Sequence, residues 1–410
     1  MSISQIYMDN ASTTQVDKRV VLAIEPFFEE VFANPSSVYS MGLRAKDAID
    51  SSRFVIAKFI GAKTDEIIFT SGGSESNNLA IFGSLKKVKK GRIITSMIEH
   101  PSVLKPIEAL EKRGFEVIKI KPKPNGVVSA QDIKKYLNSD TVLVTIMYAN
   151  NEIGTIQPIA KIAKVIRNFR STKLQTPNSK QIINSKLQTQ KAKLHETAYP
   201  LFHTDACQAP QYLQMDVDKL GVDLLTINGS KIHAPKGIGA LYVKNGTQIE
   251  PRQHGGNHEH KLRAGTENIP AIIGFSKAVE LAKQKDILKM TQLRDKLIKE
   301  IQKIPDTYLN GPTGKKRLCN NINFSFKGVE GESLGKLLDD KGIATSTGSA
   351  CSALTLEPSY ILKAIGLSDE LANSSLRISL SRFNTLKEID YLIKILPNII
   401  QKLRKISPIY

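Results

Sequence analysis

Two short polar segments of the sequence place a carboxylate and an amine directly after runs of apolar residues. Residues 203–208 read His-Thr-Asp-Ala-Cys-Gln, with Asp205 at the centre, and residues 227–237 include Lys231. A lysine that forms a Schiff base and an acid that keeps a pyridinium nitrogen protonated are two parts of a pyridoxal phosphate site. Spacing alone leaves open the alternative that Lys231 is a surface lysine.

A third part of such a site is a cup for phosphate, which residues 70–78 could supply. They read Thr-Ser-Gly-Gly-Ser-Glu-Ser-Asn-Asn, between an expected strand and an expected helix. Small residues such as Gly73 let backbone N–H groups approach an anion, and the hydroxyl of Ser74 could donate as well. Many turns of this kind only cap a helix, and the Gly-Lys-Ser/Thr ending of a Walker loop is missing from the segment.

Cysteine chemistry is indicated at one of three positions. Cys351 lies within residues 345–358, a stretch of small residues between an expected strand and helix, as is typical of a nucleophile on a loop. Cys207 and Cys319 stand in apolar or strand contexts and are expected to be buried small hydrophobes. Three cysteines cannot form a disulfide framework, so the reduced cytoplasm is the expected compartment.

The elements that must position these residues follow an alternating pattern. Apolar runs that are expected to be buried strands are separated by segments with helical periodicity, which favours a mostly parallel sheet covered on both faces. The expected strands are residues 66–70, 92–96, 115–120, 141–146, 201–204 and 224–227. The first part of the chain is therefore predicted to be an α/β domain.

The pattern changes after about residue 262. One long helix is expected over residues 269–303, followed by an Asn-Gly-Pro turn at 310–312 and a strand over 321–326. Further helix, strand and helix segments continue to residue 410, so this region is interpreted as a smaller α+β domain.

Residues 171–198 differ in composition from their surroundings. They are polar and lysine-rich, contain Lys-Leu-Gln-Thr twice, and follow a helix expected to end near Asn168. Such a stretch offers no apolar face to bury, which predicts a surface insertion that is dispensable for chemistry.

Composition limits the class of protein. The chain has 410 residues, of which 41% are hydrophobic and 24% charged, and no run approaches the ~18–20 apolar residues of a membrane span. The net charge of +19 could steer an acidic protein or a nucleic acid toward the surface. Because no aromatic-interleaved basic motif accompanies the charge, we interpret the lysines as solvated and do not expect direct nucleic-acid binding.

Several motifs stand in the order found in cysteine desulfurases of the class V aminotransferase superfamily. The motifs are residues 7–14 (Tyr-Met-Asp-Asn-Ala-Ser-Thr-Thr), 34–37, 71–78, 99–100, 150–154 (Asn-Asn-Glu-Ile-Gly), 205–208, 348–351 (Gly-Ser-Ala-Cys), 356–366 and 403–408. The chain resembles this family over its whole length except residues 171–198. Its long cysteine segment is similar to that of the members that feed iron–sulfur assembly.

The resemblance implies a fold and a division into domains. The fold would be α/β, that of a fold-type I pyridoxal-phosphate enzyme, with a large domain built on a mostly parallel seven-stranded sheet. Residues 1–14 would join the small domain, and residues 15–262 would form the large cofactor-binding domain with its insertion at 171–198. Residues 263–410 would form the small α+β domain that carries the cysteine segment.

The resemblance also implies roles for residues around pyridoxal 5′-phosphate. Lys231 would be the Schiff-base lysine, Asp205 would pair with the pyridine nitrogen, and Gln208 would bond the phenolic oxygen. His100 would stack on the ring and move protons, with a satisfied core histidine as the alternative. The remaining cofactor-binding residues would be Gly73, Ser74, Asn151, Asn228, Ser230 and, from the other subunit of a homodimer, Thr266.

The substrate and the partners follow from the same resemblance. Asn151 and Arg377 match positions that orient the substrate carboxylate, a role that suits a guanidinium fork. Cys351 would attack the sulfur of cofactor-bound L-cysteine, which leaves L-alanine and a persulfide. The acceptors would be an iron–sulfur scaffold protein and others, including those that serve tRNA thiolation.

The sequence departs from the family pattern at three places. Asn228-Gly-Ser230 stands where Ser-Gly-His is usual, which alters two side chains of the phosphate cup. Residues 255–261 read Gly-Gly-Asn-His-Glu-His-Lys and follow His254, but their spacing fits no standard zinc pattern and no metal site is expected. Ser381 replaces a common glycine.

Two other kinds of function stay open as alternatives. One is a selenocysteine lyase or another class V enzyme, although an aminotransferase would not need the cysteine nucleophile at Cys351. The other is a weakly active desulfurase-like scaffold protein that engages acidic partners or RNA, an idea motivated by the altered phosphate cup and the net charge. Retention of the whole set of expected catalytic and cofactor residues weighs against the scaffold.

Overall fold

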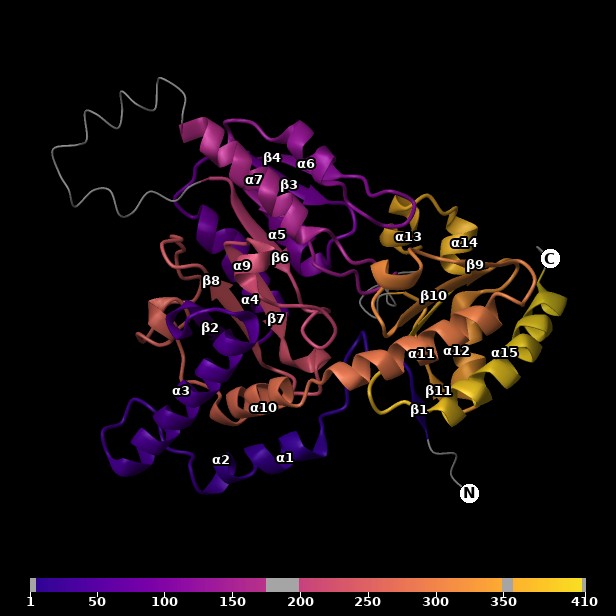
Figure 1. The fold of residues 1–410 in the computed structure, drawn as a ribbon, viewed down its shortest axis with the longest axis horizontal. Coiled ribbons are helices and arrows are strands. Elements are labelled where there is room, and N and C mark those ends of the chain that lie inside the picture. The colour runs from indigo at the N-terminus through magenta and orange to yellow at the C-terminus, as the bar shows by residue number, and fades with distance from the viewer. Residues whose placement is uncertain (1–4, 175–198, 349–356, 408–410) are drawn as a thin grey trace.

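The computed structural model describes residues 5–174, 199–348 and 357–407, and its central feature is a seven-stranded sheet (Figure 1). The strands are β2 (Ile67–Thr70), β3 (Arg92–Ser96), β4 (Glu116–Ile120), β5 (Thr141–Thr145), β6 (Leu201–Asp205), β7 (Leu224–Asn228) and β8 (Gly239–Val243). Their order is β2-β8-β7-β6-β5-β3-β4, with β8 antiparallel to both neighbours and the other pairs parallel. The predicted α/β fold with a mostly parallel sheet is confirmed.

The apolar runs found in the sequence form six of these strands, with ends that differ by at most one residue. β6 is buried along its whole length, as expected for a strand covered on both faces. Glu66, which was expected in the first strand, instead ends a 3₁₀ turn, where its carboxylate accepts a hydrogen bond from the backbone N–H of Lys63. β8 is the strand that the sequence pattern did not identify.

Successive side chains of the strands point to opposite faces and so build separate cores. Ile94, Val144 and Phe202 belong to one hydrophobic cluster, whereas Ile93 and Leu143 belong to another on the opposite face. The covering helices are α1 (Lys18–Ile24), α2 (Pro26–Glu29), α3 (Ser40–Ile60), α4 (Gly73–Asn78), α5 (Pro101–Glu111), α6 (Ala130–Tyr136), α7 (Ile159–Leu174), α9 (Val217–Leu220) and α10 (Ile269–Glu280).

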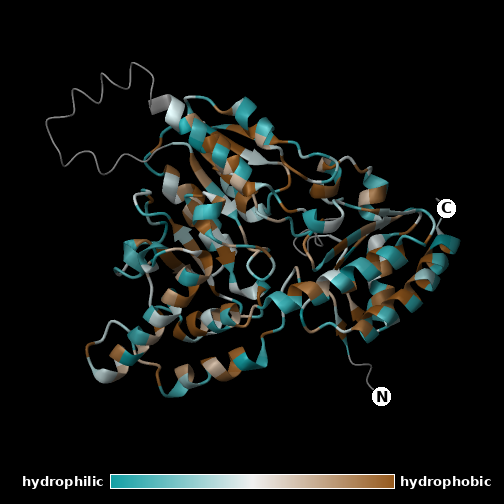
Figure 2. Cartoon of the chain, in the orientation of Figure 1, coloured by the Kyte–Doolittle hydropathy of each residue, from teal (hydrophilic) through white to brown (hydrophobic). Residues whose placement is uncertain are grey.

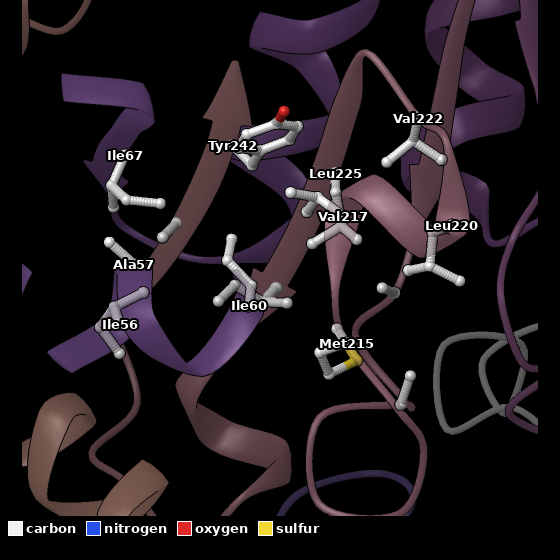
Figure 3. Packing of buried hydrophobic residues seen from close by; sticks show 14 of the residues in the cluster. Ile56, Ala57, Ile60, Ile67, Met215, Val217, Leu220, Val222, Leu225 and Tyr242 are labelled. Carbon is white, nitrogen blue, oxygen red and sulfur yellow. The ribbon is translucent and has the colours of Figure 1, made fainter. Parts of the chain in front are cut away.

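Helix α3 illustrates how the first core forms. Ile56 and Ile60 stand four residues apart and therefore share one face of the helix. Both belong to the cluster shown in Figure 3, which also includes Leu225 and Tyr242 of the sheet, and all four side chains are buried. Burial of each isoleucine stabilises the fold by roughly 1.5–3 kcal/mol.

A second group of elements, orange to yellow in Figure 1 apart from the indigo β1, forms its own core. Its strands are β9 (Thr307–Leu309), β10 (Asn321–Phe326) and β12 (Ser375–Ser379) in an antiparallel sheet, and β1 (Ile6–Tyr7) paired in parallel with β11 (Ile343–Ala344). Its helices are α11 (Gln284–Ile301), α12 (Gly331–Asp339) and α15 (Leu386–Ile406). The short helices α13 (Tyr360–Ala364) and α14 (Asp369–Asn373) pack in a separate cluster with Ile98 and Ile153. Figure 2 shows α15 with hydrophobic and hydrophilic residues alternating in bands, as expected for a helix with one buried face.

The prediction of one long helix over residues 269–303 is wrong, because α10 ends at Glu280 and α11 begins at Gln284. Phe275 of α10 packs in the core of the large sheet, whereas Leu297 of α11 packs in the second core. The break has no glycine or proline to mark it, and Lys283 simply adopts an extended backbone conformation.

Two boundaries expected from the sequence, that between the domains and the end of the helix before the insertion, can be compared with the structure. The domain boundary at residue 262 stays a prediction, and the packing of α10 against α3 favours a position closer to residue 283. The helix before the insertion runs to Leu174 and not to residue 168, while residues 175–198 lie outside the described residues. None of the described helices is both long and apolar enough to cross a membrane.

Candidate active site

A cavity of about 210 Å³ lies where β6 and β7 end, between the large sheet and β12. Nine of the predicted site residues line it: Gly73, Ser74, His100, Asn151, Asp205, Gln208, Asn228, Lys231 and Arg377. The other lining residues are Ala11, Ser12, Ser102, Met147, Ala149 and Cys207. Ser230 and Thr266 are not among the lining residues, and Cys351 lies outside the described residues.

Asp205 stands at the end of β6 and is buried at one wall of the cavity. Its Oδ2 accepts a hydrogen bond of 2.7 Å from Asn77 Nδ2, and its Oδ1 accepts one of 3.0 Å from the backbone N–H of Cys207. Two donors from different elements therefore fix the orientation of this carboxylate.

His100 occupies the N-cap position of α5. Its Nδ1 accepts a hydrogen bond of 3.1 Å from the backbone N–H of Ser102, which can only donate. In the neutral imidazole the proton therefore lies on Nε2. Burial lowers the pKa of His100, with the charge of Lys231 acting in the same direction and Asp205 opposing it.

The hydroxyl of Ser102 connects His100 to Asp205. Ser102 Oγ lies 2.8 Å from His100 Nδ1 and accepts a hydrogen bond of 2.8 Å from Asn77 Nδ2, which also donates to Asp205. The histidine is therefore neither isolated nor a core histidine remote from the cavity. Ser102 is a site residue that the sequence reasoning missed, although it lies two residues after His100.

Ala11 and Ser12 of the N-terminal segment line the cavity and contact three predicted site residues. Lys231 Nζ donates to the carbonyl oxygen of Ser12, and Gln208 Nε2 donates to the carbonyl oxygen of Ala11 at 2.9 Å. Ser12 Oγ accepts from Arg377 Nη2 at 2.7 Å. Ala11 and Ser12 could not be found from side-chain chemistry, because backbone carbonyls make two of these contacts.

Arg377 of β12 is 1% exposed, and its guanidinium group is only partly paired. Its Nη2 forms an ion pair of 2.7 Å with Asp9, and its Nη1 donates to the carbonyl oxygen of Asn151 at 3.3 Å. Arg377 Nε and Asn151 Oδ1 are buried without a hydrogen-bond partner among the described residues. A ligand that offers both an acceptor and a donor would satisfy these two atoms.

The expectation that Cys207 is a buried small hydrophobe is wrong, because Cys207 is only partly buried and lines the cavity. Its Sγ lies only 2.6 Å from the position that a Cβ atom on Gly73 would take. Burial raises the pKa of the Cys207 thiol, and Asp205 adds to the effect, so the thiol is neutral. Cys319 is buried in a hydrophobic cluster, as predicted.

Gly73→Ala is expected to lower the free energy of unfolding by about 1–3 kcal/mol, because the new methyl group would clash with Cys207 Sγ. The double variant Gly73→Ala/Cys207→Ala should recover part of that loss. Gly335→Ala in α12 is the control, since its Cβ would meet only a methyl group at 3.8 Å. Urea unfolding measures all three, and a Gly73→Ala variant as stable as Gly335→Ala would contradict the packing argument.

Glu99, next to His100, is fully buried, and its Oε1 accepts hydrogen bonds from Ser96 Oγ at 2.5 Å and from the backbone N–H of Met147 at 3.0 Å. Burial raises the pKa of Glu99 to about 8 despite these donors. The folded protein therefore keeps the proton to a higher pH than the unfolded chain does, and stability falls as the pH rises from 4.5 to about 8.

Glu99→Gln is expected to remove this decline, which amounts to at most about 5 kcal/mol. The check is thermal unfolding between pH 5 and pH 9, with the exposed Glu111→Gln on α5 as the control. A Glu99→Gln variant that loses stability with pH as steeply as the control would show that Glu99 is not the responsible group.

Residues 254–261, which depart from the family pattern, are held in place by hydrogen bonds to Glu259. Glu259 receives two hydrogen bonds of 2.7 Å from Arg53 and one of 2.8 Å from the backbone N–H of Phe69. Within the part of the chain that the structure describes, no group of three or more His, Cys, Asp or Glu side chains could hold a metal ion.

A family model and a known relative both match most of the chain. The family model described as aminotransferase class-V matches residues 6–194 and 184–392. Cysteine desulfurase IscS of Dictyoglomus turgidum is 47% identical over 410 residues, which covers 98% of this chain and 96% of that protein.

Two solved structures superimpose on nearly the whole chain. A NifS-like protein superimposes with a TM-score of 0.84 at 32% identity, covering 97% of this chain and 100% of that one. SspA in complex with cysteine superimposes with a TM-score of 0.78 at 35% identity, covering 93% and 100%. The chain belongs to the class-V aminotransferase family and, within it, to the cysteine desulfurases.

Proposed function

We propose that the chain is a pyridoxal-phosphate-dependent cysteine desulfurase that converts L-cysteine to L-alanine and transfers the sulfur to Cys351 as a persulfide. The observation that carries this proposal is the convergence of Lys231, Asp205 and Arg377 on one cavity. Arg377 and Asn151 both line this cavity and each keeps a side-chain atom without a partner among the described residues, which suits an amino acid with its carboxylate and ammonium groups.

The residues present fit pyridoxal phosphate. Lys231 supplies an amine, Asp205 supplies a carboxylate oriented by two donors, and Gly73 and Ser74 line the cavity at the start of α4. When bound, pyridoxal phosphate acts as an electron sink for bonds to the α-carbon of an amino acid. Glycine and serine backbone N–H groups at a helix start suit its phosphate.

Side chains of the protein would transfer protons, bind the substrate carboxylate and contact the cofactor. His100 holds a proton on Nε2 and an acceptor on Nδ1 that Ser102 occupies, so only Nε2 is available for proton transfer. Arg377, which lines the cavity, would bind the substrate carboxylate beside its existing ion pair with Asp9. Gln208 Nε2 has a second N–H that would bond a cofactor oxygen while the first keeps its hydrogen bond to the carbonyl oxygen of Ala11.

Sulfur transfer would use the Cys351 thiolate as the nucleophile. It would form an S–S bond to the substrate sulfur while the substrate C–S bond breaks. The electron pair of that bond would stay with the carbon fragment, which gains a proton and leaves as alanine.

A homodimer is part of the proposal. Thr266 is exposed and lies away from the cavity of its own chain, which suits a contribution to a second copy. Large apolar side chains are exposed on and beside α1–α3, as is common where a partner binds. They include Leu22, Phe28, Phe32, Val38, Tyr39 and Phe54.

The acceptors are proposed on the resemblance and on charge. Iron–sulfur scaffold proteins, together with acceptors for tRNA thiolation, would receive the persulfide sulfur in the cytoplasm. The net charge of +19 would favour acidic acceptors, and salt would weaken that steering.

The test is to supply the purified protein with L-cysteine and a thiol reductant and to measure alanine and sulfide. Equal amounts of both products are expected, together with a visible absorption band from the bound cofactor. Faster turnover of L-selenocysteine, with no alanine from L-cysteine, would favour the selenocysteine lyase. Cofactor-free protein that forms neither product would favour the scaffold.

A further inference from the structure

The side chains of Asn228 and Ser230 contact each other where β7 passes into the turn that carries Lys231. Asn228 Oδ1 accepts a hydrogen bond of 2.9 Å from the backbone N–H of Ser230 and lies 3.1 Å from Ser230 Oγ. A backbone N–H can only donate, so the amide atom that faces it must be the oxygen. The orientation of the Asn228 carboxamide is therefore fixed.

The amide nitrogen of Asn228 points the other way, toward the start of α4. Asn228 Nδ2 lies 3.5 Å from the position that a Cβ atom on Gly73 would take. Sheet pairing holds the two residues in place, since Gly239 pairs with Asn228 on one side and with Thr70, just before the α4 turn, on the other. Two side-chain N–H donors thus face a helix start whose first N–H groups have no partner within the helix.

Ser230 is held firmly but away from the cavity. Its carbonyl oxygen accepts hydrogen bonds from the backbone N–H of Thr14 at 2.8 Å and from Thr14 Oγ1 at 3.0 Å. Its hydroxyl carries one proton, and donating that proton to Asn228 Oδ1 leaves none for a ligand. Ser230 is not among the residues that line the cavity, whereas Asn228 is.

We propose that Ser230 is a positioning residue that locks the Asn228 carboxamide so that its NH₂ group binds an anion held at Gly73 and Ser74. Ser230 itself does not touch the anion. The inference rests on the proposed function, in which the anion is the phosphate group of pyridoxal phosphate. It replaces the earlier expectation that Ser230 binds the cofactor directly.

The test compares two ligands that differ only in the phosphate group. The full-length protein, stripped of cofactor, is titrated with pyridoxal 5′-phosphate and with pyridoxal, and binding is followed by absorbance. Asn228→Ala should raise the Kd for pyridoxal phosphate by about 10- to 100-fold, as for a lost hydrogen bond to a charged group. The Kd for pyridoxal should stay within about twofold.

Asn228→Asp tests the role of the NH₂ group most directly. Its carboxylate keeps an oxygen for Ser230 but places a second oxygen where the NH₂ group stood, so it should weaken binding of pyridoxal phosphate at least as much as Asn228→Ala does. An affinity for pyridoxal phosphate equal to that of the unaltered protein would overturn the inference. Far-UV circular dichroism of the stripped variants checks that each is folded.

Ser230→Ala tests the indirect role. It should raise the Kd for pyridoxal phosphate by about 2- to 10-fold in the unaltered protein and have no further effect in the Asn228→Ala background. Equal effects in both backgrounds, or parallel losses for pyridoxal, would overturn the positioning role. Failure of the unaltered protein to bind pyridoxal phosphate at all would instead overturn the proposed function and this inference together.

Discussion

Lys231→Ala is expected to abolish the visible absorption of the bound cofactor and to lower desulfurase activity by about 10²- to 10⁴-fold. Lys231 lies on the turn that follows β7 and lines the same cavity as Asp205. Alanine removes the amine without a change in the backbone. The visible spectrum and the release of alanine from L-cysteine are the measurements.

Lys236→Ala provides a matched control. Lys236 lies five residues further on and also donates to a carbonyl oxygen of the N-terminal segment, that of Thr14 at 3.3 Å, but it does not line the cavity. The control should keep both the absorption band and the activity. If Lys231→Ala keeps the band and turns over like Lys236→Ala, the assignment of the cofactor lysine is wrong.

Cys351→Ser is expected to lower alanine production by at least about 10³-fold while leaving cofactor binding intact. Serine has nearly the size of cysteine, but its hydroxyl is scarcely ionised at neutral pH and cannot accept the sulfur as a persulfide. The variant should therefore still bind L-cysteine and change the visible spectrum. Mass spectrometry should detect no persulfide on it.

Cys319→Ser is the control for that experiment. The Cys319 thiol is buried away from the cavity, and burial raises its pKa to about 12, so it takes no part in the chemistry. Cys207→Ser should also keep persulfide formation, but its cofactor content must be measured because Cys207 lines the cavity. Alanine release from Cys351→Ser at the unaltered rate would exclude Cys351 as the nucleophile.

The sequence predicts the strands well because their apolar runs are buried on both faces, as in β6 and β7. It does not predict the break between α10 and α11, because both helices have apolar faces and only the position of the two cores separates them. β8 lies between β2 and β7 and runs against both, an arrangement that no local pattern specifies.

The candidate site was predictable where side-chain chemistry is specific. Asp205, Lys231 and Arg377 carry ionisable groups in recognisable motifs, and all three line the cavity. Ala11 and Ser12 were missed because they act mainly through backbone carbonyls. Ser230, which was expected to bind the cofactor, does not line the cavity, and its Oγ lies 3.1 Å from Asn228 Oδ1, a contact that spacing alone does not reveal.

The contacts between the N-terminal segment and β12 have a consequence for synthesis on the ribosome. Asp9 pairs with Arg377, and the backbone N–H of Ala11 donates to Ser379 Oγ at 2.8 Å, a partner 368 residues further along the chain. At about 5–20 residues per second, ribosomes need roughly 20–70 s to make the intervening chain. Asp9 and Ala11 therefore leave the ribosome long before their partners in β12, and a nascent chain cannot complete the cavity before β12 has emerged.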